Sequence, residues 1–277
     1  MKEIIRLTCL MVIIISSNGT PTDLGDGSIF LVKYGYLSED YSTRRSSSIN
    51  NTISEAIVKF QKFYGLDITG VLSDETRSIM EMPRCGMKDI DYETSASRRH
   101  KLDGSKWSKN KITYRVSKYT KQIKMNSVDD VFKRAFKMWS DVTDLKFKQK
   151  KKGSGDIDIQ FNKGYHGHKS RFDGPHGVLA HASYPRRQKS YVHFDDEETF
   201  TDGQEVKKGI NLLQVAVHEF GHSLGLHHSE VNSSIMFPSY HRNLHNVKLH
   251  SDDIRRIQAL YGKNPSDRKR TRTSKTI

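Results

Sequence analysis

The sequence has no apolar run long enough to cross a membrane. The longest one, Leu7 to Ile15, is too short to span a bilayer, and the chain carries no hydrophobic anchor at its C-terminal end. Lys2 and Arg6 precede this run and small residues follow it, which is the pattern of a secretory signal peptide. We therefore predict a signal peptide over residues 1–19, no membrane span and a secreted protein.

Cysteine is also scarce. The two cysteines are Cys9, inside the segment that we expect to be removed, and Cys85. A mature chain with one cysteine cannot form an intramolecular disulfide framework. A single cysteine in a secreted protein needs a partner or a chemical use.

Acidic residues are too few to balance the basic ones. There are 46 Lys and Arg against 32 Asp and Glu, so the formal net charge is +14. Such a surface attracts polyanions, for which heparan-type glycans are the natural candidates outside the cell. A soluble basic surface with no such partner is an equally open alternative. The 277 residues leave room for two modest domains.

The most specific pattern in the chain reads HExxHxxGxxH and begins at His218. A helix places His218 and His222 on one face, where two imidazoles can bind one Zn²⁺. Gly225 can end the helix and let His228 arrive as a third ligand. Glu219 could then take a proton from a zinc-bound water. Three protein ligands and water form the catalytic arrangement rather than the structural one.

The alternative is a buried amphipathic helix that happens to carry histidines. However, the extended pattern resembles that of the metzincins, and Ser229 after the third histidine is similar to the matrixins among them. The segment SIMFP resembles the matrixin Met-turn, which implies that Met236 lies beneath the zinc. The resemblance also implies that Pro238 and Tyr240 line the substrate pocket and that the carbonyl of Ala180, on an edge strand, receives the substrate amide.

The segment PRCGMKD resembles the matrixin cysteine switch, PRCGxxD. The resemblance implies that Cys85 fills the fourth zinc position of a latent form, because a thiolate binds zinc better than water does. Arg84 and Asp89 are expected to pair and hold the segment. The family usually has Val-Pro where this chain has Met87 and Lys88, a departure that we expect to loosen the loop. A chance surface cysteine is the alternative.

Further metal ligands are implied between residues 166 and 198. This region resembles the structural-zinc loop of the matrixins, which implies four zinc ligands, His166, His168, His181 and His193. The family has aspartate at the second position, so His168 either completes a four-histidine site or faces solvent. A resemblance to the family's calcium loop implies oxygen ligands from Asp173, Gly174, His176, Val178, Asp195 and Glu198. We expect a second family calcium site to be lost, because basic residues replace glycines in the loop at 186–192.

Local patterns predict an α+β catalytic domain, and the resemblance to the matrixins implies a small three-helix propeptide before it. The predicted segments are a signal peptide at 1–19, a propeptide at 20–99, a catalytic domain at 100–262 and a basic tail at 263–277. Propeptide helices are expected at 29–37, 53–64 and 73–82, in a unit that resembles peptidoglycan-binding modules. Catalytic strands are expected at 107–116, 145–147, 156–161 and 178–182, and helices at 210–224 and 252–262. Ser127 and Asp130 predict a capping box that opens one more helix. The resemblance implies a metzincin domain with a twisted mixed sheet.

These patterns together predict a secreted zinc endopeptidase made as a latent zymogen. We expect it to hydrolyse extracellular proteins, to need two zinc ions and at least one calcium ion, and to act as a monomer. Heparan-type glycans and protein inhibitors of metalloproteases are the further partners expected. The resemblance ends near residue 262, so a minimal matrilysin-like form without a hemopexin domain is expected. A non-catalytic glycan-binding protein on the same scaffold is the alternative.

Overall fold

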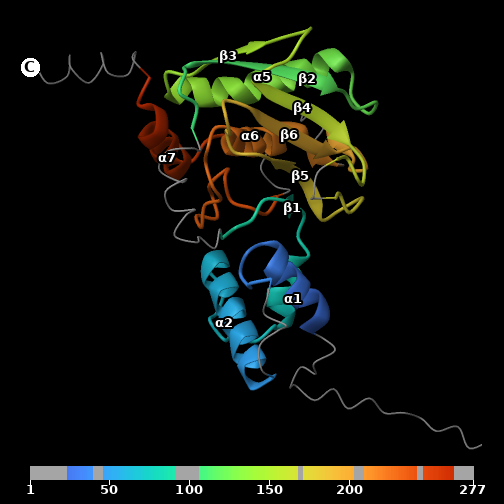
Figure 1. Cartoon of the computed structure of the whole chain (residues 1–277), viewed down its shortest axis with the longest axis vertical. Coiled ribbons are helices and arrows are strands. Elements are labelled where there is room, and N and C mark those ends of the chain that lie inside the picture. The colour runs from blue at the N-terminus through green and yellow to red at the C-terminus, as the bar shows by residue number, and fades with distance from the viewer. Residues whose placement is uncertain are drawn as a thin grey trace, which may run out of the picture.

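The computed structural model describes residues 24–39, 46–90, 106–167, 171–202, 209–241 and 246–264. The predicted signal peptide, His168 and most of the predicted basic tail lie outside the described residues. Within those residues, no helix combines the length and the apolarity that crossing a membrane requires. Figure 1 shows a small group of helices from the N-terminal part of the chain beside a larger body that contains a sheet.

Three helices form the smaller body, and they confirm the predicted helical propeptide. They are α1 (Leu24–Lys33), α2 (Ser46–Tyr64) and α3 (Asp74–Met80). Their shared core is aromatic, and the rings of Tyr36 and Phe60 meet edge to face at 5.3 Å. The first helix ends before the predicted boundary because Gly35 turns the chain with a φ of 83°. A Cβ at that position would lie 1.9 Å from the carbonyl oxygen of Ile90, so only glycine fits.

Six strands form one sheet in the spatial order β1-β5-β6-β4-β2-β3. They are β1 (Arg84–Cys85), β2 (Lys111–Lys118), β3 (Lys146–Gln149), β4 (Ile157–Asn162), β5 (Val178–Ala182) and β6 (Ser190–Asp195). The neighbouring strands of this sheet are parallel except for β5 and β6, which confirms the predicted mixed sheet. Strand β1 comes from the propeptide and extends the edge beside β5 (Figure 1).

The helices of the larger body pack on one another and on this sheet. They are α5 (Met125–Val142), α6 (Leu212–Ser223) and α7 (Ser251–Tyr261), and a short strand pair, β7 (Phe200–Thr201) and β8 (Ile210–Asn211), leads into α6. The rings of Phe136 in α5 and Phe220 in α6 stack at 3.9 Å. Trp139 donates its indole N–H to the carbonyl of Val217 at 3.0 Å. These contacts hold α6, which carries the HExxH histidines, at the centre of the core.

Two local predictions for this body need correction. The predicted capping box of Ser127 and Asp130 is wrong, because α5 begins at Met125 and its N-cap, Lys124, makes no side-chain cap hydrogen bond. The amide of Val128 already donates to the carbonyl of Lys124, so the first turn is complete before the predicted box. The predicted loop at 186–192 is a tight turn that passes into β6 at residue 190. The loss of a calcium site there stays a prediction.

Candidate metal centre

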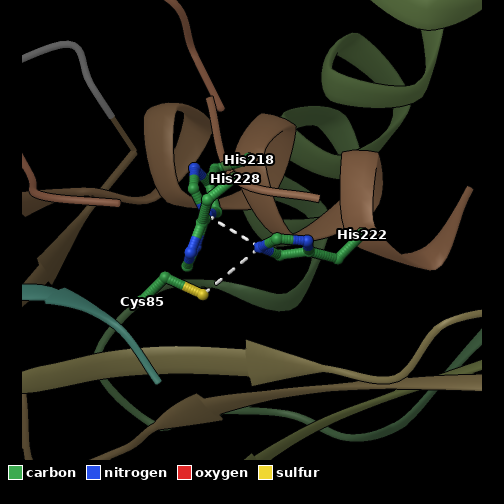
Figure 2. Close-up of side chains that lie close together, drawn as sticks. All are labelled: Cys85, His218, His222 and His228. Atoms are coloured by element: carbon green, nitrogen blue, oxygen red, sulfur yellow. Dashed lines mark hydrogen bonds between the residues drawn. The ribbon is translucent and has the colours of Figure 1, made fainter. Parts of the chain in front are cut away.

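Three histidines converge at the C-terminal half of α6 (Figure 2). The Nε2 atoms of His218 and His222 lie 3.1 Å apart, as the spacing of four residues on a helix predicts. The chain leaves the helix at Gly225, whose φ is 101°, and returns to bring His228 against the other two rings. Asn211 starts the helix by accepting a hydrogen bond from the amide of Leu213 at 3.0 Å.

The hydrogen bonds of these rings leave lone pairs directed toward one point. His218 Nδ1 lies 2.7 Å from the carbonyl of Ile235, and His222 Nδ1 lies 2.7 Å from the carbonyl of Leu226. A carbonyl can only accept, so each Nδ1 carries the proton and each Nε2 presents a lone pair. Burial lowers the pKa of His218 to about 3 and holds that of His222 well below its ordinary value, so both rings are neutral.

Cys85 closes the group from the propeptide side (Figure 2). Its Sγ lies 3.5 Å from His222 Nε2, and one ligand atom from each of the four residues falls within 4.8 Å of all the others. Zinc–nitrogen and zinc–sulfur bonds of about 2.0–2.3 Å in a tetrahedron suit such separations. Two facing lone pairs and a buried thiol with no cation between them are unfavourable. The donor set therefore fits Zn²⁺, with Cys85 in the fourth position.

Glu219 lies on α6 beside this group, and it is fully buried. Apart from the Cys85 thiol, no group within the described ranges forms a hydrogen bond with its carboxylate oxygens. Burial raises the pKa of Glu219 to about 8, and the neighbouring Cys85 thiol acts in the opposite direction. A buried carboxyl with this pKa can take up or release a proton near neutral pH.

Met236 packs against α6 at Gly221, beside His222, and its expected place beneath the zinc stays a prediction. It is fully buried, and its Sδ would meet a Cβ added to Gly221 at 2.3 Å. The turn around it is held by Asp253, which accepts hydrogen bonds from the amides of Ile235 at 3.0 Å and Met236 at 3.3 Å and from the Ser234 hydroxyl. Sequence reasoning missed this role of Asp253, because no local pattern links residue 253 to the turn at residues 234–236.

Three of the four histidines predicted for a structural zinc site lie together. They are His166, His181 and His193, and their ligand atoms also fall within 4.8 Å of one another. The Nε2 atoms of His166 and His181 are 2.9 Å apart, and His166 Nδ1 lies 2.8 Å from the carbonyl of Gly164. His181 and His193 are directly opposite on β5 and β6, which fixes two of the ligands by strand register. The predicted fourth ligand, His168, lies outside the described residues.

Among the described residues, the predicted calcium ligands lie less close to one another than the two groups of histidines do. Asp195 is fully buried, burial raises its pKa to about 6, and a hydrogen bond from the backbone of Gly174 opposes that rise. Asp173 instead accepts a hydrogen bond from the amide of Val178 at 2.9 Å. Among the described residues, the carboxylates of Asp173, Asp195 and Glu198 do not form a group as compact as the two above. His176 has a φ of 68°, so the backbone of this loop is strongly curved.

A buried polar network, which we call the latch, holds the cysteine segment in place. Arg84 and Asp89 form the predicted ion pair at 2.5 Å, with both side chains almost fully buried. Asp89 also accepts a hydrogen bond from the hydroxyl of Tyr36 at 2.7 Å, and Arg84 donates to the hydroxyl of Tyr64 at 3.1 Å. The Arg84 guanidinium lies 3.5 Å from the centre of the Tyr34 ring. The tyrosines of the latch were not predicted, because no local pattern links them to residues 84–89.

The backbone of the cysteine segment, residues 83–89, forms hydrogen bonds with both walls of the cleft. The amide of Gly86 donates to the carbonyl of Ala180 at 2.8 Å, the group expected to receive a substrate amide. On the opposite wall, the amide of Cys85 donates to the carbonyl of Pro238 at 2.9 Å, and the amide of Tyr240 donates to Pro83 at 2.8 Å. All three predicted substrate-binding residues therefore contact the propeptide.

Comparisons with known proteins agree with this geometry. The family model for Matrixin matches residues 106–262, and a model for a putative peptidoglycan binding domain matches residues 26–80. A macrophage metalloelastase of Rattus norvegicus is 42% identical over 84% of this chain and 50% of its own length. A hatching enzyme of Paracentrotus lividus is 42% identical over 84% of the chain and 38% of its length, and the human matrix metalloproteinase-15 is 36% identical over 93% and 41%. The chain thus spans half or less of the length of these relatives.

Proposed function

The chain belongs to the matrixin family, and on that premise we propose that it is the latent form of a zinc-dependent endopeptidase that acts on extracellular proteins. One observation carries the proposal. Cys85 of the propeptide and three histidines of the HExxHxxGxxH segment present four ligand atoms to a single buried point. This arrangement can hold zinc and keep the fourth position closed until the propeptide leaves.

The residues of the cleft supply the remaining chemistry. Zinc held by His218, His222 and His228 would act as a Lewis acid and would raise the acidity of water. Glu219, buried beside the ligands, accepts the proton of the attacking water and passes it to the leaving amine. The carbonyl of Ala180 on β5 is freed when the propeptide departs, and it then binds the substrate backbone as an added strand.

The proposal includes further metal ions. A second zinc ion is held by His166, His181 and His193, with His168 as the fourth ligand, and it stabilises the fold. At least one calcium ion binds near Asp195, which is buried, has a carboxylate oxygen with no partner among the described residues, and lies beside the backbone of Gly174.

Secretion and activation follow the predicted segments. Residues 1–19 direct the chain out of the cell, and a trypsin-like cut within the basic stretch at 98–101 releases the propeptide, residues 20–99. The catalytic domain then begins near residue 100 and ends at 262, before the basic tail. We propose that the active form is a monomer that protein inhibitors of metalloproteases recognise.

An exposed row of lysines supports a sulfated glycan as a further partner. Lys111 on β2 lies directly opposite Lys146 on β3, at the edge of the sheet, and Lys148 follows on the same face. Like charges opposite each other on neighbouring strands destabilise a sheet, so a bound polyanion would relieve the repulsion. Retention on heparin that falls when Lys146 and Lys148 are changed to serine is the expected result.

The first experiment compares the secreted zymogen with its Glu219→Ala variant. Both are clipped with trypsin and given a quenched peptide, with and without a zinc chelator. We expect cleavage only after clipping, only with Glu219 and only without chelator, with a loss of at least about 100-fold in the variant. Correctly folded, zinc-loaded and clipped protein that cleaves no peptide would refute the proposed activity.

A further inference from the structure

A pocket opens beside Glu219 and His218, and its lining contains polar groups that neither the metal centre nor the latch uses. Its apolar walls come from Leu179, Val215, Ile235 and Phe237. Two polar side chains, Gln214 and His241, also line it. The pocket adjoins the residues proposed to bind the substrate, so a substrate side chain next to the scissile bond can enter it.

His241 presents an unsatisfied nitrogen in this pocket. Its Nε2 is buried and has no hydrogen-bond partner among the described residues. The His241 ring forms a hydrogen bond with the backbone of Asn232. Burial lowers the pKa of His241, so the ring is neutral. The ring is held in orientation because it stacks on Phe237, with the two centres 5.6 Å apart. A neutral ring that donates from Nδ1 to a carbonyl offers Nε2 as an acceptor.

Gln214 provides the second polar group. It lies one helical turn before His218 on α6, so its side chain points to the same side as the proposed zinc ligand. The residue is buried, at 6% exposure, although it lines the pocket. An amide can both donate and accept, so Gln214 and His241 together can bind a group that carries N–H or O–H.

We infer that this pocket selects peptides with a neutral hydrogen-bond donor, such as the glutamine amide, on the residue that enters it beside the scissile bond. The inference rests on the proposed endopeptidase function. A purely aliphatic side chain would displace water from His241 and Gln214 and leave buried polar atoms unpaired, which is costly. A charged side chain would have to lose its hydration among apolar walls. Glutamine avoids both penalties and has about the length of methionine.

The test uses the full chain, clipped with trypsin, and quenched peptides that differ in one residue. Glutamine, methionine or leucine is placed in turn on each side of the scissile bond. For the favoured position, we expect the ratio of kcat/KM for glutamine to that for methionine to fall about tenfold in Gln214→Leu and in His241→Phe. The second variant keeps an aromatic ring to stack on Phe237. Gln258→Leu makes the same chemical change on α7, outside the pocket, and should leave the ratio unchanged.

The outcomes separate this inference from the proposed function. Peptide cleavage that favours methionine or leucine over glutamine in the unmodified chain would overturn the inference alone, whatever the variants do. A glutamine preference that survives both substitutions would also overturn it, because other groups would then bind the amide. If zinc-loaded wild-type protein cleaves none of the peptides, the proposed function fails and the inference fails with it.

Discussion

Replacing Asp89 by asparagine should open the latch without removing the zinc-binding thiol. Arg84 is 1% exposed, and Asp89 is the carboxylate that neutralises its guanidinium at 2.5 Å. Burial alone would raise the pKa of Asp89, but Arg84 and His228 hold it below its ordinary value, so the carboxylate is charged at neutral pH. Asparagine preserves the shape and removes the charge, which leaves Arg84 buried beside the Tyr34 ring and the Tyr64 hydroxyl.

The size of the effect follows from the burial of this pair. Removing one partner of a buried ion pair costs about 3–5 kcal/mol, because the other charge stays desolvated. Arg84 and Tyr36 use different oxygens of Asp89, and asparagine keeps only one of them. That oxygen can still accept from Arg84 while the Tyr36 hydroxyl accepts from the new amide, so we expect the lower end, about 3 kcal/mol. The open form of the zymogen should therefore become about 100-fold more populated, since about 1.4 kcal/mol corresponds to a factor of ten.

The assay measures the open form directly. A thiol-reactive dye is added to uncut zymogen, and the rate of Cys85 modification should rise about 100-fold in Asp89→Asn, together with peptide cleavage before any clipping. Lys88→Ala is the matched control, because Lys88 and Glu39 form an exposed pair at 3.8 Å in the same segment. Such pairs contribute about 0–1 kcal/mol at most. Equal dye rates in Asp89→Asn and the wild type would refute the argument that the buried pair maintains latency.

Three further predictions concern the larger body. Gly221→Ala should lower the free energy of unfolding by about 1–3 kcal/mol, seen as a lower denaturant midpoint, because the new Cβ would lie 2.3 Å from Met236 Sδ in a filled core. His193→Ala should reduce bound zinc from two ions to one per chain in metal analysis and lower the melting temperature, whereas unchanged zinc would exclude the second site. Burial alone would raise the pKa of Asp156, but hydrogen bonds from Lys109 and Thr113 bring it below the ordinary value. A carboxyl whose pKa is lower in the folded state stabilises the fold above the unfolded pKa, near pH 4, and this stability is lost as the pH falls further. Below about pH 4, the urea midpoint of Asp156→Asn should therefore fall less steeply with decreasing pH than that of the wild type.

Elements with a strong local signal were predictable from the sequence. The alternation of apolar residues predicted a strand at 156–161, and β4 runs from Ile157 to Asn162. The zinc helix was expected at 210–224, and α6 runs from Leu212 to Ser223 with Asn211 as its cap. The three histidines of the HExxHxxGxxH segment converge as predicted, because their spacing, a helix and a glycine turn are all local features.

Contacts between distant segments were not predictable in the same way. Tyr36, in the turn after α1, and Tyr64, at the end of α2, reach Asp89 and Arg84 only through the folding of the propeptide. The Lys33 side chain lies 3.7 Å from Asp173 of the predicted calcium loop, across the boundary between the two bodies. His241 appears in the sequence as one more histidine after the Met-turn, and only the fold shows that its Nε2 is buried in the pocket. Such pairings depend on tertiary packing, which periodicity does not report.

The backbone of the cysteine segment pairs with the cleft as an extended peptide would, while its side chains are held by contacts with the rest of the propeptide. Strand β1 is very short, and its contacts with β5 and with the Pro238 carbonyl are main-chain hydrogen bonds that any extended peptide could make. Each such bond contributes only about 1 kcal/mol net, because water competes for the same groups. The specific anchors are Arg84 and Asp89, which contact Tyr64 at the end of α2 and Tyr36 in the turn after α1. Asp89 also lies 2.7 Å from Nδ1 of His228. Loss of α1 and α2 would therefore remove the tyrosine contacts and weaken the hold on Cys85, so destruction of the helices should raise activity even when the peptide bonds around Cys85 stay intact.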